Sequence, residues 1–194
     1  MLWIALAAQI SVAQPIAPMF SNDDFPAYLQ QAAASRNILI AVTVASDGRV
    51  SGCYPELSSG DPKLDQYTCI LVMNRGRFAP ARRSDGTPVT GVIRLPISWN
   101  ISSTADNNWT HGDLDVTVNQ LPKGVSSPHF ESLAIDVEGS GKIVNCQGDA
   151  RAKNPELTNV ACETVIKAYT APIAKDAKGA AVESVQNVLV RFTK

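Results

Sequence analysis

The chain has 194 residues, of which 45% are hydrophobic and 18% charged, a composition that is ordinary for a globular protein and excludes a disordered chain. Its formal net charge of −1 gives no basic field for binding nucleic acid and no polybasic patch for a membrane surface. A chain of this length can hold one large domain or two small ones.

The first thirteen residues are mostly apolar and are typical of the core of a signal peptide, and Ser11-Val12-Ala13 offers a cleavage site before Gln14. No Lys or Arg precedes Arg36, so the basic leader of such a peptide is missing. We expect residues 1–13 to be a signal peptide that directs export to an oxidising compartment. The alternative is a short apolar tail packed on the folded domain. A membrane span is disfavoured because it needs roughly 20 apolar residues.

Residues 14–23 are polar and contain proline, so they are expected to be a linker, and a first domain is expected over residues 24–101. Alternating and helical patterns of apolar residues predict its elements. Asp47-Gly48 favours a tight hairpin turn between the first two strands. The expected elements are a helix over residues 25–35, strands over residues 38–45 and 49–57, a helix beginning at Pro62, and a last strand over residues 88–99.

A polar stretch over residues 100–111 is the expected domain boundary, and a second domain is expected over residues 112–194. Its first strand, around residues 114–118, stands where the first domain has a helix. Asp113 and Asp115 flank that strand and are expected on its solvent face. The remaining elements are expected to be strands over residues 130–137, 142–147 and 182–192, with a helix over residues 155–169.

The four cysteines indicate an internal repeat. Cys53 and Cys69 are 16 residues apart (69 − 53), as are Cys146 and Cys162 (162 − 146), and the two pairs are offset by 93 residues (146 − 53). The same offset relates other positions, such as Gly48 to Gly141 and Leu64 to Leu157. The chain is therefore predicted to be a tandem repeat of one small unit.

Disulfides are the expected role of these cysteines, because zinc sites favour much shorter spacings between ligands. Of the three possible connectivities, the repeat favours pairing within each unit. Each bridge would tie the second strand of a hairpin to the following helix and would stabilise its unit by about 3 kcal/mol. The expected fold class is α+β, with two tandem units that are each a three-stranded, mostly antiparallel sheet with one or two helices on one face.

No set of catalytic residues stands out. Ser58-Ser59-Gly60 lacks the surrounding Gly-x-Ser-x-Gly pattern of a nucleophile, and His111 and His129 have no convincing acidic partner. We therefore predict neither enzymatic activity nor a metal or cofactor site. Trp99 and Trp109 flank the boundary and could either pack the two units together or line a peptide groove.

The first half carries an ordered series of short motifs: Asp24-Phe25-Pro26-Ala27, Asp47-Gly48-Arg49-Val50, Ser58-Ser59-Gly60 followed by Leu64-Asp65, Arg77-Phe78-Ala79-Pro80-Ala81, and Gly86-Thr87-Pro88-Val89. In this combination, residues 24–100 resemble the TonB C-terminal domain family. The second half resembles the family only weakly, since Arg151-Ala152-Lys153 replaces Ser-Ser-Gly and Thr158 replaces the aspartate. The resemblance implies a periplasmic protein that binds an extended peptide of an outer-membrane transporter as an added strand.

The family's full-length members carry a membrane anchor and a long spacer, whereas only a short linker is expected here, so we expect a soluble relative. The last strand of the first unit is the predicted peptide-binding edge because its middle is neutral and β-branched. The alternative is a structural or envelope-assembly protein whose two repeats cover each other's sheet edges. The predicted edge residues are Val89, Thr90, Gly91, Val92, Ile93, Leu95, Ile97 and Trp99.

Overall fold

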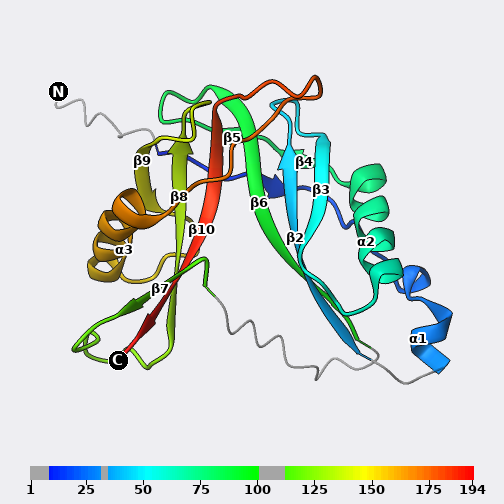
Figure 1. Cartoon of the computed structure of the whole chain (residues 1–194), viewed down its shortest axis with the longest axis horizontal. Helices are drawn as coiled ribbons and strands as arrows, with labels where there is room; N and C mark the ends of the chain where they lie inside the picture. The colour runs from blue at the N-terminus through cyan, green and yellow to red at the C-terminus, as the bar shows by residue number, and fades with distance from the viewer. Residues whose placement is uncertain (1–8, 32–34, 101–111) are drawn as a thin grey trace, which may run out of the picture.

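The computed structural model describes residues 9–31, 35–100 and 112–194 and shows an α+β fold with a mixed sheet (Figure 1). The helices are α1 (Ala27–Gln31), α2 (Pro62–Arg75) and α3 (Pro155–Ala168), with a short 3₁₀ turn, η1 (Asn22–Asp24). The strands are β1 (Gln14–Pro15), β2 (Arg36–Val44), β3 (Val50–Leu57), β4 (Phe78–Ala79), β5 (Ala81–Arg82), β6 (Pro88–Trp99), β7 (Leu114–Thr117), β8 (His129–Val137), β9 (Ile143–Gly148) and β10 (Ser184–Thr193).

One eight-stranded sheet runs through both halves of the chain. Its main order is β3-β2-β6-β10-β8-β9, with β5 beside β6 and β7 beside β10. The first half (residues 9–100) and the second half (residues 112–194) meet where β6 and β10 pair in parallel, over Thr90–Val92 and Ser184–Gln186. Below this short contact the two strands diverge, which gives the two arms seen in Figure 1. The two separate three-stranded sheets expected from the sequence are thus joined into one.

The two long helices, α2 and α3, cover opposite faces of this sheet. Side chains alternate between faces along a strand, so Val185 and Val188 of β10 point to opposite sides. Val185 belongs to a core that also contains Leu64, Leu71 and Val72 of α2. Val188 belongs to a second core with Leu157, Ala161 and Val165 of α3. Each long helix therefore covers its own core, and the sheet separates the two cores.

Local sequence signals explain the ends of α2 and α3. Asp61 caps α2 by accepting hydrogen bonds from the backbone N–H groups of Lys63 and Leu64, and Pro62 occupies the first turn. Asn154 and Pro155 do the same for α3. Helix α1 begins at Ala27, two residues after the expected start, and is described as far as Gln31; residues 32–34 lie outside the described residues.

The segment over residues 9–20 crosses the face of the sheet that α2 covers. Ile10, Val12, Ala13 and Met19 are buried in the first core, and β1 pairs with β4. Ile10 also exchanges hydrogen bonds with the side chain of Gln147 in β9, at the far edge of the sheet. Ile10, Val12 and Ala13, which belong to the expected signal peptide, are therefore packed on the fold, whereas in the expected linker Met19 is buried and residues 14–18 are exposed. Cleavage before Gln14 would remove three side chains from this core.

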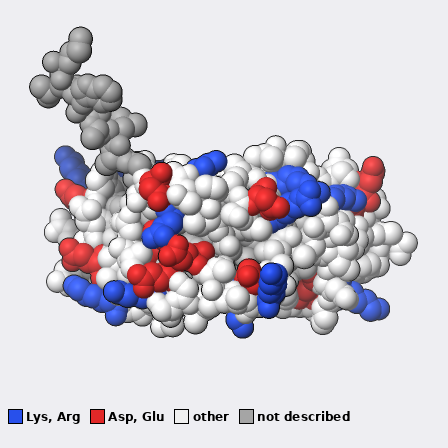
Figure 2. Space-filling view, turned by 90° about the horizontal axis from the view of Figure 1, so that it is seen from above, with Lys and Arg blue, Asp and Glu red and all other residues white. Residues whose placement is uncertain are grey.

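Both expected disulfides are present. Cys53 of β3 is bonded to Cys69 of α2, and Cys146 of β9 to Cys162 of α3, with Cα atoms 5.5 and 5.6 Å apart. Of the helices that the structure describes, none has the length and apolar character needed to cross a membrane. Figure 2 shows positive and negative side chains interspersed over the upper face, in keeping with the net charge of −1.

Candidate functional site

The space between β3 and α2 forms an open groove of about 570 Å³. The Cys53–Cys69 bridge fixes α2 against β3 and lines the groove together with Pro55. Ile70 and Met73, three residues apart on α2, line it as well and remain 47% and 40% exposed. Such side chains, large and apolar yet left in water beside a concave surface, are typical of a binding site.

Strand β3 is an outer strand of the sheet. It pairs with β2, from Leu39↔Leu57 to Val44↔Val50, and no other described strand pairs with it. Its other side therefore offers N–H and C=O groups to an added strand. Pro55 has no N–H, which removes one donor from that edge. Cys53 and Pro55 share the face that α2 covers, because side chains alternate along the strand.

The Ser58-Ser59-Gly60 motif contacts the first turns of α2, the helix that lines the groove. Both serine hydroxyls and the Ser59 N–H donate hydrogen bonds to the carboxylate of Asp65, at 2.5–2.9 Å. Burial alone would raise the pKa of Asp65, but these hydrogen bonds outweigh it and hold that pKa below the ordinary 3.8. The serines therefore orient a carboxylate.

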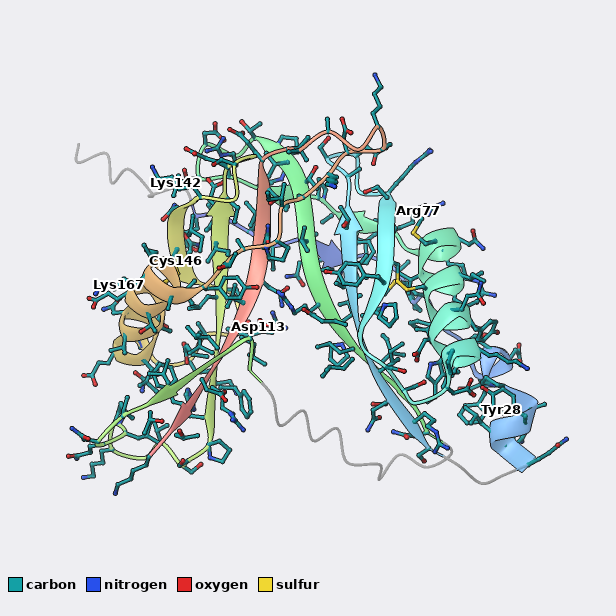
Figure 3. The ribbon with its side chains drawn as sticks, viewed as in Figure 1. Tyr28, Arg77, Asp113, Lys142, Cys146 and Lys167 are labelled. Atoms are coloured by element: carbon teal, nitrogen blue, oxygen red, sulfur yellow. A yellow bond between two sulfur atoms is a disulfide. The ribbon has the colours of Figure 1, made fainter. Side chains whose placement is uncertain are left out.

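A second carboxylate at this end of α2 accepts a hydrogen bond from a residue of α1. The Tyr28 hydroxyl donates to Asp61 at 2.6 Å, and this bond raises the pKa of Tyr28 to about 12. Because Asp61 also caps α2, the contact fixes α1 against the first turn of the groove helix. Figure 3 shows Tyr28 on α1, beside the lower end of α2.

The strand expected to be the open edge, β6, lies inside the sheet. On one side it pairs with β2 from Gly91 to Trp99. On the other side Val89 pairs with Ala81 of β5, and Thr90, Gly91 and Val92 pair with β10. The expectation of an open edge therefore does not hold for Val89 to Val92, because β5 covers Val89 and the second half of the chain covers Thr90 to Val92. Past Val92 no described strand lies along this side, and the side chains of Ile93, Leu95, Ile97 and Trp99 pack into the first core.

A buried arginine joins the two halves where β6 and β10 begin to diverge. The Arg94 side chain, 9% exposed, lies 2.8 Å from Glu56 of β3 and 3.0 Å from Asp113. It also donates to the Tyr169 hydroxyl and to the backbone carbonyl of Asn187, both at 2.9 Å. Asp113 lies between β10 and β6 in Figure 3. This cluster ties β3, β6, β10 and the end of α3 together.

The prediction that Asp113 lies on a solvent face is wrong. Asp113 accepts a hydrogen bond from the Leu189 N–H at 2.7 Å and its side chain is only 12% exposed. Burial raises its pKa, although Arg94 opposes the shift. Asp115 is half-exposed and pairs with Arg191, as expected for the outer face. No sequence pattern marked Arg94 and Asp113 as partners, because they are distant in the chain.

The histidine that the structure describes has a local role. His129 lies 3.0 Å from Glu131, whose other oxygen accepts the Thr158 hydroxyl at 2.7 Å. His111 and Trp109 lie outside the described residues. Within the described ranges no group of three or more His, Cys, Asp or Glu side chains could hold a metal ion.

Comparison with known proteins gives no assignment: no family model, curated protein or solved structure matches this chain. The site must therefore be judged on its own geometry.

Proposed function

We propose that this chain is a non-catalytic binding protein that takes up an extended peptide as an added strand on the outer edge of β3. One observation carries the proposal: an edge strand and an apolar groove meet at the same place. Backbone pairing supplies affinity in such a complex, and pockets for alternate side chains supply specificity. The edge of β3 offers the first, and the groove beside Ile70 and Met73 offers the second.

The geometry restricts the bound peptide. Alternate side chains of an added strand would lie on the face that α2 covers, so an apolar one can enter the groove between Cys53 and Ile70. Pro55 supplies a carbonyl acceptor but no donor, so continuous pairing is limited to short segments on either side of it. The expected ligand is therefore a short extended segment with an apolar side chain at alternate positions.

We also propose that the two halves are diverged copies of one unit. The constant offset of 93 residues, the equal cysteine spacing and the same hairpin–helix–strand order support this. A two-fold axis along the strands produces the observed arrangement, in which β6 and β10 pair in parallel and the helices lie on opposite faces. The groove differs between the copies, since Glu163 stands where the first half has Ile70 and Gly148 where it has Pro55.

Export to the periplasm and an outer-membrane transporter segment as partner are part of the same proposal. The resemblance to TonB C-terminal domains implies both, and two disulfides suit an oxidising compartment. Recognition through main-chain groups is compatible with a neutral protein, because it does not require a strongly charged surface.

The test is a titration of the isotope-labelled full chain with a capped nine-residue peptide in which valine alternates with threonine, and with transporter N-terminal peptides. We expect shifts of the Cys53, Tyr54 and Leu57 amides and of the Ile70 and Met73 methyl groups. Ile70→Lys should weaken binding roughly 10- to 100-fold, as expected for losing a buried aliphatic contact. The matched control is Ile166→Lys on α3, where an exposed isoleucine lies outside the groove.

Two results would contradict this assignment. Shifts confined to β9, the other outer strand, would move the site to the second half. Equal affinity for a scrambled peptide of the same composition would remove the need for an extended strand.

A structural role is the second candidate, and the pairing of Thr90–Val92 with Ser184–Gln186 favours it. In this case the two halves serve to cover each other's inner edges. Amide hydrogen exchange distinguishes the candidates: a structural protein should show slow exchange along β6 and β10 and no change in β3 when peptide is added.

A further inference from the structure

A second concave region lies at the far end of β6 and shares no lining residue with the β3 groove. It is a pocket of about 670 Å³ between the end of β6 and the segment that contains η1 and α1. Phe20 and Phe25 both line it and are half-buried. Each ring meets the buried Trp99 edge to face, with centroids 5.5 and 6.2 Å apart. The aromatic cluster fixes the two phenyl rings as rigid walls.

The polar groups of the pocket are amides and hydroxyls. Among the described lining residues none carries a charged side chain, which disfavours an ionic ligand, because no group there could neutralise it. The polar lining side chains are those of Ser21, Asn22, Gln30, Ser98 and Asn100. Each primary amide offers both donors and an acceptor, and each hydroxyl can act in either sense.

One of these groups lacks a partner. The side-chain oxygen of Asn100 is buried, and it receives no hydrogen bond. A buried acceptor without a donor is unfavourable, so a ligand that brings an O–H or N–H group to it gains affinity in addition to its other contacts. The pocket is therefore suited to a ligand rich in donors that also has an apolar face.

We infer that this pocket binds a neutral saccharide. A sugar ring presents C–H groups to an aromatic wall and hydroxyls to amides, and it carries no charge. The volume of about 670 Å³ is within the range of small-molecule sites and accommodates one or two sugar rings. An extended peptide fits less well: Pro96 in the lining has no N–H, so it offers the backbone no donor at that position.

The experiment is a titration of the labelled full chain with three probes: N-acetylglucosamine trimer, maltotriose, and the alternating valine–threonine peptide. A saccharide should shift the side-chain amides of Gln30 and Asn100 and the indole N–H of Trp99, and should leave the β3 amides unchanged. Gln30→Ala should weaken saccharide binding roughly 3- to 10-fold, the value of one hydrogen bond. Gln31→Ala, the exposed neighbour on α1 outside the lining, is the matched control and should have no effect.

Every outcome decides the question. Binding that is weakened by Gln30→Ala and unchanged by Gln31→Ala supports the site, and Asn100→Ala should weaken it as Gln30→Ala does if the orphaned oxygen is used. No shift with either saccharide at millimolar concentration, or equal weakening by both glutamine variants, overturns it. Peptide binding at these amides in place of saccharide binding also overturns it.

Discussion

At the scale of single residues, Gly48 carries one constraint that the sequence predicts and one that it does not. Asp47-Gly48 predicts a turn, and Gly48 does adopt the left-handed backbone conformation, with φ +84°. The tertiary structure adds a second constraint that the sequence does not show. The backbone carbonyl of Phe78 lies where a Cβ on Gly48 would stand, at 2.1 Å.

Gly48→Ala should therefore cost more stability than backbone strain alone. Gly60 has nearly the same φ, +82°, and open space around it, so Gly60→Ala should cost about 1–2 kcal/mol. Gly48→Ala should cost at least about 1 kcal/mol more, because β4 must move. Urea unfolding of the two variants gives the comparison, and equal costs would show that the contact with Phe78 is unimportant.

Asp65 provides a pH-dependent contribution to stability. Its pKa is lowered in the folded state, so its stabilising effect is present above the ordinary value of 3.8 and is lost as the pH falls through the folded pKa. Asp65→Asn should cost about 1–3 kcal/mol near pH 7, because Ser58 and Ser59 lose a charged acceptor. Near pH 3 the cost should shrink. Chemical unfolding at both values measures it, and a cost independent of pH would exclude the charged hydrogen bonds as its source.

The second half also has a hydrogen-bonded carboxylate at the start of its long helix, but different residues form it. Thr158 stands where the first half has Asp65 and donates to Glu131 of β8, which is 1% exposed. The carboxylate has thus moved from the helix to a neighbouring strand, while the hydrogen-bonded link between them is kept. The weak resemblance of the second half to the first at this motif reflects an exchange of roles that only the contacts show.

At the scale of elements, the chain's own patterning predicted the main strands and the two long helices closely. The helix expected from Pro62 is α2, and the strands expected over residues 88–99 and 114–118 are β6 and β7. The short strands β1, β4 and β5 were not predicted. Strands of two residues carry no alternation to detect, and their pairing depends on partners far along the chain.

Each disulfide should contribute similarly to stability. Both bridges close loops of the same length, 16 residues, and join an outer strand to the helix that covers it. Replacing Cys53 and Cys69 by alanine should lower the free energy of unfolding by about 3 kcal/mol, and so should replacing Cys146 and Cys162. Denaturant unfolding checks this. Alkylation of the denatured, unreduced chain should label no cysteine; labelling would show that a bridge is absent in solution.

At the scale of the whole molecule, two arginines and the N-terminal segment hold the halves in one sheet. Arg94 bridges Glu56 and Asp113, and Arg83 reaches Asp136 of β8 at 3.1 Å. The segment over residues 9–20 crosses the same junction, where Ala13 lies against Gly91 of β6. Since this segment also contacts β9 and β4, it braces the sheet from one arm to the other.

The N-terminal segment should therefore be part of the folded core. Val12 is 5% exposed and Ile16, four residues later, is 66% exposed. Val12→Ala should cost about 2 kcal/mol from lost apolar burial, whereas Ile16→Ala should change stability by less than about 0.5 kcal/mol. Thermal and urea unfolding of both variants decide between a packed segment and a removable leader. If both variants match the parent, residues 9–13 are dispensable, as a cleaved signal peptide would be.

The sequence alone determined the cysteine pairing, the main elements and the α+β class, because spacing, alternation and turn residues act locally. The identity of the edge strands was decided only by the tertiary structure. Thr90 to Val92 have the composition of an open edge, yet β10, almost a hundred residues away, pairs with them. Strand β3, beside the groove, is an outer strand of the sheet instead. Strand order depends on which distant segments meet, and hydrophobic periodicity carries no information about that choice.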